Sequence, residues 1–321
     1  MFKAKVSSLP SKNPVRAQAS RFRILSRQLL LGASALTALR LGHQLWNLRM
    51  RPARRLALRG KVAVITGASS GIGRALACEL AAAGCHLVLA ARRDELLSTL
   101  ATELESRHGV RTLVVRTDVA DQAQAEVLAE RALEHFGHVD ILINNAGIAT
   151  YSAFDQDPIA GMRQVMEVNY WGTVYCTRAM LPAMQARHRG MIVNISSVAG
   201  KMGQPGIANY SASKHAVNGL SAALRIELAR FGIHVLLICP TSTKTDIVSV
   251  SSNHSAIRFN PEQYFGMSTE RVARETVSAI LDRRREHVLG AGERLGLVIN
   301  TLSPSLVDAV IKRVIPFIFK T

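Results

Sequence analysis

Residues 61–73 read KVAVITGASSGIG, and this stretch decides the fold. Its first half is a short apolar run typical of a buried strand, and its second half is a turn rich in glycine and serine. Because Gly67, Gly71 and Gly73 lack side chains, the backbone can turn tightly there and approach a pyrophosphate closely. The helix expected after the turn would offer free N–H groups and its positive dipole end to that anion. The stretch therefore predicts a strand, a dinucleotide-binding turn and a helix.

The same alternation of apolar runs and helical stretches continues to residue 290. We expect strands at residues 61–66, 86–91, 111–116, 140–145, 190–196, 233–240 and 286–290. We expect helices between them at residues 74–84, 94–109, 123–137, 158–187, 207–230 and 269–285. Buried strands that alternate with helices form parallel sheets with right-handed crossovers. The predicted fold is α/β: a single domain with a doubly wound, Rossmann-type parallel sheet of about seven strands, whose ligand crevice lies at the carboxyl ends of the strands.

The positive charge of the chain is concentrated at its amino end. The 321 residues carry a formal net charge of +17, but residues 1–61 contain fourteen Lys and Arg and no Asp or Glu. The remaining residues hold 26 basic and 23 acidic side chains, a net charge of only +3. The hydrophobic fraction of 48% argues against a disordered chain. Since the body is almost neutral and shows no nucleic-acid recognition motif, we expect no nucleic-acid partner.

The basic leader contains one apolar stretch, residues 24–48. Its uncharged part, residues 28–39, is shorter than the about 18–20 residues that a membrane span needs, and a longer span would bury Arg40. The leucines, Trp46 and the flanking arginines favour a helix lying on an anionic membrane surface. The Arg-rich, acid-free composition also matches a mitochondrial presequence, and a disordered extension is the third alternative. We expect membrane association with the active site facing the cytoplasm; a mitochondrial or cytoplasmic protein is the alternative.

The residues after the second strand predict the cofactor. The chain reads AARR over residues 90–93, with no acid until Asp94. An acidic residue there would bind the ribose 2′-hydroxyl of NAD(H), whereas an arginine pairs with the 2′-phosphate of NADP(H). We therefore expect NADP(H) rather than NAD(H), with Arg92 rather than Arg93 as the selecting residue. Asp118, after the third strand, is expected to accept a hydrogen bond from the adenine amino group.

Two side chains, rather than a metal, are expected to carry the chemistry. Tyr210 and Lys214 lie four residues apart in YSASK, on one face of an expected helix. An ammonium beside a phenol, together with a cationic nicotinamide, would stabilise the phenolate and lower the tyrosine pKa toward neutrality. Tyr210 is therefore a candidate proton donor to a carbonyl that hydride reduces. The four cysteines have no CxxC pair and no metal-ligand spacing, so we expect no metal.

Five motifs follow one another along the chain: TGASSGIG (66–73), NNAG (144–147), VNYWG (168–172), NISSVAG (194–200) and YSASK (210–214). In this order they resemble the short-chain dehydrogenase/reductase family over about residues 58–290. The resemblance implies an NADP(H)-dependent oxidoreductase that interconverts a carbonyl and a secondary alcohol by hydride transfer. The alternative is a non-catalytic dinucleotide-binding scaffold or sensor with the same fold.

The resemblance also implies four catalytic roles. Ser197 lies 13 residues before Tyr210, which is the family's spacing between its catalytic serine and tyrosine, and Ser196 does not have that spacing. Ser197 would donate a hydrogen bond to the substrate carbonyl. Tyr210 would act as general acid in reduction and as general base in oxidation. Lys214 would bind the nicotinamide ribose, and Asn169 would hold a water that links Lys214 to solvent.

The expected cofactor-binding residues share a place at the carboxyl ends of the strands or on the catalytic helix. They are Gly67, Ser69, Ser70, Gly71, Ile72, Gly73, Arg92, Asp118, Val119, Asn145, Ala146, Gly147, Tyr210, Lys214 and Thr245. One position departs from the family, which commonly has Pro-Gly after the sixth strand, since Thr241 here replaces that glycine. Threonine lacks the freedom of glycine at positive φ, so we expect a different loop. Thr245 has the spacing of the family's nicotinamide-contacting threonine, with Thr243 as the alternative.

The segment after the sixth strand, residues 243–268, is rich in apolar side chains and low in charge. As a cap over the substrate it favours a lipophilic carbonyl or alcohol of the steroid, retinoid or long-chain lipid class, and hence a role in lipid metabolism. We divide the chain into a leader (1–57), a catalytic domain (58–290) and an apolar, amphipathic extension (291–321) that also suits a membrane surface. Because the family often dimerises through the two long helices, a homo-oligomer (dimer or tetramer) is expected.

Overall fold

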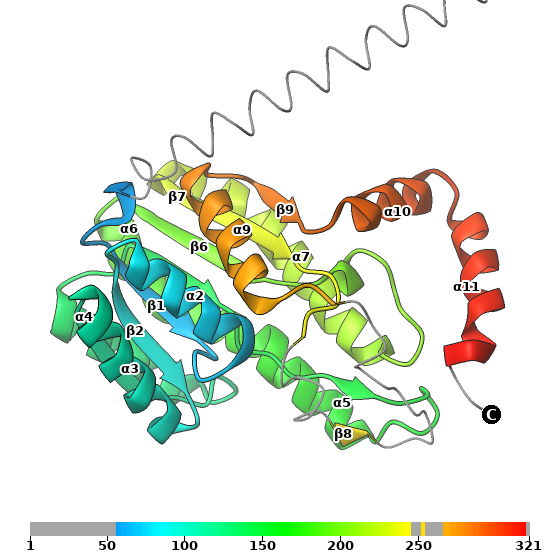
Figure 1. The fold of residues 1–321 in the computed structure, drawn as a ribbon, viewed down its shortest axis with the longest axis horizontal. Helices are drawn as coiled ribbons and strands as arrows, with labels where there is room; N and C mark the ends of the chain where they lie inside the picture. Colours follow the sequence, from blue (N-terminus) through cyan, green and yellow to red (C-terminus); the bar gives the residue numbers. More distant parts are fainter. Residues whose placement is uncertain (1–55, 245–251, 254–265, 319–321) are drawn as a thin grey trace, which may run out of the picture. The chain divides into compact units, whose positions relative to one another are not determined.

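Seven parallel strands form the central sheet of the computed structural model, in the order β3-β2-β1-β4-β6-β7-β9 (Figure 1). The strands are β1 (Val62–Thr66), β2 (His86–Ala91), β3 (Thr112–Arg116), β4 (Ile141–Asn144), β6 (Gly190–Ile195), β7 (Ile233–Cys239) and β9 (Glu286–Val288). The order reverses between β1 and β4, and this switch point places the ligand crevice at their carboxyl ends. The predicted doubly wound sheet of seven strands is confirmed.

The structure describes residues 56–244, 252–253 and 266–318, with the backbone alone for 252–253 and 314–318. The chain divides into two units, residues 1–54 and 55–321, and all described elements belong to the second. The predictions about the leader, Thr245 and most of the substrate cap therefore lie outside the described residues. No helix among the described ones is long and apolar enough to cross a membrane.

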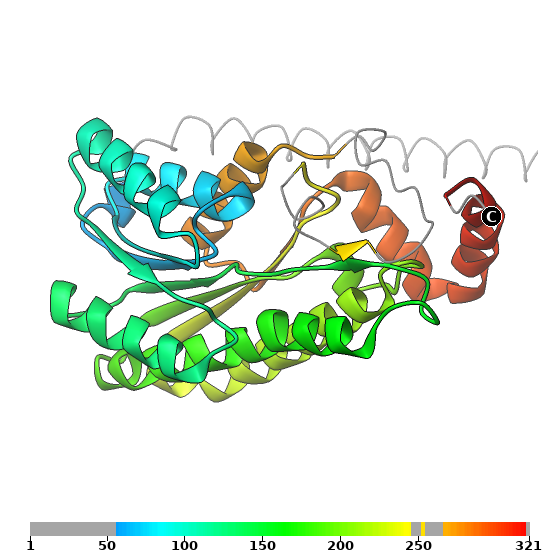
Figure 2. The ribbon, with the colours of Figure 1, turned by 90° about the horizontal axis from the view of Figure 1, so that it is seen from below.

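Helices cover both faces of the sheet (Figure 2). One face carries α2 (Gly71–Ala82), α3 (Asp94–His108) and α9 (Thr269–Leu281), and the other carries α4 (Gln122–Phe136), α5 (Ile159–Met166), α6 (Gly172–Ala186) and α7 (Ala208–Glu227). Alternate strand residues pack into two cores: Ile65 and Leu87 face the first layer, Val64 and Val88 the second. Since both faces are buried, the strands read as continuous apolar runs, and their positions were predictable to within about two residues.

The expected helical stretch 158–187 contains a π-helical turn. Between α5 and α6 the segment Glu167–Trp171 forms a π-helical turn, η2, that contains Asn169. Such turns insert one residue into a helix and are frequent at functional sites. The expected helical stretch is therefore present, but its π-helical turn, at the residues nearest the predicted catalytic asparagine, was not predicted.

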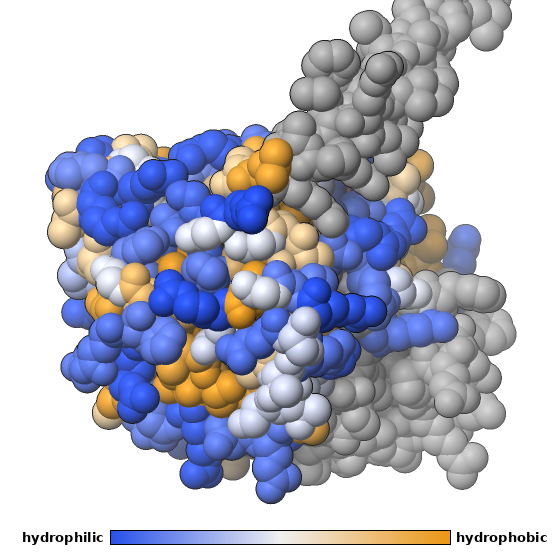
Figure 3. Space-filling model, turned by 60° about the vertical axis from the view of Figure 1, so that its left-hand side comes forward, coloured by the Kyte–Doolittle hydropathy of each residue, from blue (hydrophilic) through white to orange (hydrophobic). Residues whose placement is uncertain are grey.

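Two further features lie outside the seven-stranded sheet and its covering helices. Strands β5 (Thr150–Tyr151) and β8 (Ser252–Asn253) pair in parallel and join the end of the β4 loop to the cap segment. After β9 come α10 (Ala291–Leu302) and α11 (Pro304–Ile318), which expose Leu295, Val298, Leu302, Leu306 and Val310. Figure 3 shows another side of the catalytic unit, which is mostly hydrophilic around one apolar area.

Candidate active site

The turn after β1 has a backbone that only glycine fits. Gly67 and Gly71 have φ of +66° and +54°, in the left-handed region. A Cβ at Gly73 would collide with the Gly67 carbonyl oxygen and lie 2.6 Å from Asn145 Nδ2. A Cβ at Gly67 would lie 2.9 Å from Ala146 Cα. The turn therefore fits the close backbone approach that a dinucleotide pyrophosphate requires.

Helix α2 begins directly at this turn, three residues earlier than expected. Its N-cap, Ser70, has an extended backbone, and its side chain makes no capping hydrogen bond. The amide groups of the first helical turn therefore remain available for an anion. Ile72, in that turn, is half-buried against the first core.

An arginine crosses the turn, but it is Arg93. Its Nη2 donates to Ser69 Oγ at 2.9 Å and to Ser70 Oγ at 2.6 Å. Arg92 is exposed and makes no hydrogen bond or ion pair within the described part of the chain. Arg93 thus holds the two serines in place, while the guanidinium of Arg92 is free.

The loop after β4 forms the opposite wall of the crevice. Asn145 Nδ2 donates to the carbonyl oxygens of Thr66 at 2.9 Å and Gly67 at 3.3 Å, so this side chain ties the glycine turn to β4. A Cβ at Gly147 would lie 3.5 Å from Lys214 Nζ, which brings the loop to the catalytic helix. Ala146 N–H donates to Thr66 Oγ1 at 3.1 Å.

After β3, one oxygen of Asp118 accepts a hydrogen bond from the Ala120 N–H at 3.1 Å. The next residue, Val119, is buried against Gly172, where a Cβ would approach Val119 Cγ2 to 2.7 Å. The two residues thus sit at the carboxyl edge of the sheet beside the start of α6.

Asn169 links two parts of the site. Its side chain is 1% exposed; Oδ1 accepts from the Ile148 N–H, and Nδ2 donates to Ile148 O and to Ser213 Oγ, each at 2.9 Å. The side chain therefore clamps the loop after β4 to the helix that carries Tyr210. Its role in holding a relay water stays a prediction.

The structure brings Ser197, Tyr210 and Lys214 together. Ser197 lies two residues after the end of β6 and caps the short helix η3 (Val198–Gly200), and its hydroxyl hydrogen-bonds the Tyr210 phenol. Lys214 Nζ lies 5.6 Å from the centre of the Tyr210 ring and donates to the Ile195 carbonyl at 3.0 Å. Ser196 instead donates to Asn218 Oδ1 at 2.6 Å, away from the tyrosine.

Burial dominates the protonation of this site. It raises the pKa of Tyr210 to about 12, and the hydrogen bond with Ser197 offsets only part of that rise. Burial also lowers the pKa of Lys214 to about 8. Desolvation of the phenolate is the largest cause of the rise in the Tyr210 pKa. The fall in the Tyr210 pKa expected with a cationic nicotinamide beside the phenol stays a prediction. Tyr210 is a neutral phenol at pH 7, which is the form that donates a proton.

Thr241 follows β7 and resolves the departure from the family. Among the described residues other than glycine, only His188 and Arg283 have positive φ, so Thr241 avoids the left-handed region. Its hydroxyl donates to Glu293 Oε1 of α10 at 2.7 Å. The threonine therefore adopts an ordinary backbone conformation and makes a contact that glycine has no atom to make.

Sequence reasoning missed Tyr151 and Glu293. Tyr151 lies on β5, is half-buried, and is close enough that its ionisation would raise the pKa of Tyr210. Glu293 is 52 residues from Thr241. No motif or periodicity marks either residue, since both reach the site through the tertiary fold.

A dinucleotide cradle at the switch point, with a serine, a tyrosine and a lysine beside it, defines an oxidoreductase that uses a nicotinamide cofactor. The sequence profile of the short chain dehydrogenases matches residues 61–256. The chain belongs to the short-chain dehydrogenase/reductase family.

Three comparisons support this assignment. Dehydrogenase/reductase SDR family member 7B from Bos taurus is 38% identical over 94% of each chain. A short chain dehydrogenase/reductase from Burkholderia phymatum, solved with NAD, is 32% identical, with a TM-score of 0.71 over 78% of this chain and 95% of that one. A short-chain dehydrogenase from Sphingobium yanoikuyae, solved with NADPH, is 28% identical, with a TM-score of 0.67 over 77% and 96%.

Proposed function

We propose that the protein is an NADP(H)-dependent oxidoreductase that interconverts a carbonyl and a secondary alcohol on a lipophilic substrate of the steroid, retinoid or long-chain lipid class. The observation that carries the proposal is the hydrogen-bonded Ser197–Tyr210 pair with Lys214 beside it, next to the glycine cradle. The solved relatives include one with NAD and one with NADPH, so membership of the family does not choose between the two cofactors. The exposed Arg92 after β2 supports NADP(H). The low charge of residues 243–268 supports a lipophilic substrate.

When bound, the nicotinamide supplies hydride to the substrate carbon or accepts it in the reverse direction. Ser197 would donate a hydrogen bond to the carbonyl oxygen and stabilise the charge that develops there. Tyr210, neutral at pH 7, would transfer its phenolic proton to that oxygen. Lys214, with a pKa of about 8, is mainly charged at pH 7 and would stabilise the phenolate left behind.

The test separates chemistry from cofactor binding. We expect Tyr210→Phe to lower the rate of carbonyl reduction by at least about 100-fold, because general acid catalysis is lost. NADPH binding, measured by the fluorescence of the bound cofactor, should remain within about threefold of the wild type. Ala212→Ser, on the same helix, is the control; it should change neither the rate nor the binding, because residue 212 is exposed. Full turnover in Tyr210→Phe would contradict the catalytic assignment of Tyr210. NADPH binding without turnover of any carbonyl by the wild type would favour the non-catalytic scaffold.

We further propose that the protein is held at an anionic membrane surface, with its active site facing the cytoplasm. The acid-free leader supports this, as does the composition of residues 24–48. We also propose a homo-oligomer through α5–α6 and α7. Trp171 and Ile226, on these segments, are 41% and 80% exposed, which supports a contact there.

A further inference from the structure

The segment that leaves β7 holds the backbone around Ser197. The N–H of Ser196 donates to the Ile238 carbonyl at 2.7 Å, and the N–H of Val198 donates to the Pro240 carbonyl at 2.9 Å. The peptide on each side of Ser197 is therefore bound to the end of β7. A displacement of Pro240 would move the serine relative to Tyr210.

The residue after Pro240 is held in turn from the carboxyl-terminal extension. Thr241 Oγ1 donates to Glu293 Oε1 at 2.7 Å, and Glu293 lies in the first turn of α10. The N-cap of that helix is Gly290, with φ of +91°, and a Cβ there would collide with the Glu293 carboxylate. Glycine at position 290 thus leaves the space through which the carboxylate turns back toward Thr241.

The same segment fixes the base of the substrate cap. The N–H of Met267 donates to the Ser242 carbonyl at 2.8 Å, and the N–H of Lys244 donates to the Met267 carbonyl at 3.1 Å. Thr243 Oγ1 donates back to the Thr241 carbonyl at 2.8 Å. The position of Thr241 therefore affects both the loop that carries Ser197 and the two segments, around Thr243 and Met267, that flank the cap in the sequence.

We propose that Glu293 is a positioning residue of the active site: through Thr241 and Pro240 it fixes the place of Ser197 opposite Tyr210. The inference rests on the proposed reductase function. A glycine at position 241 would give α10 no such contact, so the threonine makes the catalytic loop depend on the carboxyl-terminal extension. α10 buries none of its residues, which leaves the Glu293 carboxylate as its hydrogen-bonded link to this loop.

The test compares paired variants in the full chain. Thr241→Val keeps the side-chain shape but removes the donor, and Glu293→Ala removes the acceptor, so each should lower kcat for carbonyl reduction about tenfold per NADPH-binding site. Thr241→Ser and Glu293→Gln keep a hydroxyl donor and an amide acceptor, and should stay within about twofold of the wild type. The double variant Thr241→Val/Glu293→Ala should be no slower than either single variant, because both remove one interaction. The Kd for NADPH should change by less than about twofold.

A second readout does not depend on turnover. Hydrogen exchange of the Val198 amide should accelerate in Thr241→Val and Glu293→Ala and stay slow in the two conservative variants. If the wild type reduces no carbonyl while this exchange pattern holds, the proposed function fails and the positioning link stands. If kcat per NADPH-binding site is unchanged in the first two variants, or their losses multiply in the double variant, the link is overturned. A merely structural role would lower the number of NADPH-binding sites and leave kcat per site as it was.

Discussion

Arg92 and Arg93 are neighbours in the sequence, but their side chains differ in their hydrogen bonds. The guanidinium of Arg93 donates hydrogen bonds to the hydroxyls of Ser69 and Ser70, whereas Arg92 follows the end of β2 and has no partner among the described residues. Hydrogen bonds between a guanidinium and a phosphate are charge-assisted and bidentate, so a free arginine at this place is the better selector. The sequence-based choice of Arg92 is therefore kept as a prediction.

We expect Arg92→Ala to reduce the preference for NADPH over NADH by about 10- to 100-fold, because the hydrogen bonds to the charged 2′-phosphate are lost. Arg93→Ala is the matched control; it removes the hydrogen bonds to Ser69 and Ser70, which we expect to contact either cofactor, and should weaken NADPH and NADH binding to a similar degree. The measurement is the Kd of each cofactor by fluorescence titration. A loss of preference in Arg93→Ala with none in Arg92→Ala would reverse the assignment.

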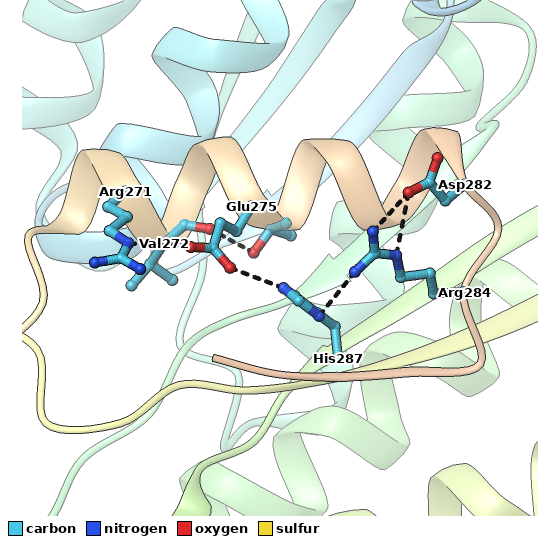
Figure 4. A network of polar contacts seen from close by, with 7 residues as sticks. Arg271, Val272, Glu275, Asp282, Arg284 and His287 are labelled. Carbon is cyan, nitrogen blue, oxygen red and sulfur yellow. Dashed lines mark hydrogen bonds and ion pairs between the residues drawn. The ribbon is translucent and has the colours of Figure 1, made fainter. Parts of the chain in front are cut away.

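At the scale of elements, the last strand and the last sheet-covering helix are joined by a polar network (Figure 4). His287 of β9 hydrogen-bonds Glu275 of α9 at 2.9 Å through Nε2, and Arg284 Nη1 lies 3.1 Å from His287 Nδ1. Arg284 also binds Asp282 at 2.8 Å, which closes the turn between α9 and β9. Because β9 is an edge strand of only three residues, this network supplements a short ladder of backbone hydrogen bonds.

The network makes stability depend on acid pH. The hydrogen bond from His287 is the largest cause that lowers the pKa of Glu275 to about 2, against an ordinary value of 4.5. A carboxyl whose folded pKa is depressed stabilises the fold above its unfolded pKa, and that contribution is lost as the pH falls from about 4.5 toward 2. We therefore expect Glu275→Gln to flatten the fall in the free energy of unfolding between pH 5 and pH 3, as measured by urea denaturation. Glu134→Gln, at an exposed position on α4, should leave that slope unchanged; equal slopes in all three proteins would contradict the prediction.

The elements differ in how far the sequence predicts them. The inner strands were predictable because they are buried on both faces and read as apolar runs, and α3 because Gly109 in the left-handed conformation ends it. The π-helical turn at Asn169 was not predicted. No motif marks it, and the Asn169 side chain hydrogen-bonds Ile148 and Ser213, which are distant in sequence. The spacing of Ser197 and Tyr210 predicted their contact, but the rise in the Tyr210 pKa depends on burial, which no motif encodes.

At the scale of the molecule, charge is distributed unevenly between the amino and the carboxyl ends of the strands, which are called the two edges of the sheet here. The three residues before each of the seven strands include nine Lys or Arg and one acid, the buried and ion-paired Asp140. The three residues after each strand include two Arg and two Asp. In a parallel sheet the first set lies along one edge and the second along the other, so the basic edge is opposite the cofactor crevice. The exposed arginines of the basic edge are Arg59, Arg111, Arg187, Arg189, Arg230, Arg283 and Arg285.

This arrangement separates two candidate membrane contacts. The exposed apolar residues of α10 and α11 follow the carboxyl end of β9, whereas the arginines lie at the amino ends of the strands. Residue 56, where the leader meets the catalytic unit, precedes β1 and so lies toward the basic edge. On the proposed attachment of the leader to a membrane, the arginines would face the bilayer and the crevice would lie at the opposite ends of the strands. We therefore predict that the basic edge, not α10 and α11, faces an anionic membrane.

In the full chain, we expect the combined substitutions Arg189→Gln, Arg230→Gln, Arg283→Gln and Arg285→Gln to weaken binding to phosphatidylserine vesicles at least tenfold, since each basic residue near such a surface contributes about 1 kcal/mol. The control changes four exposed arginines away from this edge, Arg131, Arg178, Arg271 and Arg294, to glutamine and carries the same net charge. It should bind almost as the wild type does, because the interaction falls off within a Debye length of the surface. Vesicle sedimentation at physiological salt measures both. Equal losses in the two variants would show that net charge alone governs binding, and a larger loss from Val298→Asp with Leu302→Asp would move the membrane contact to α10.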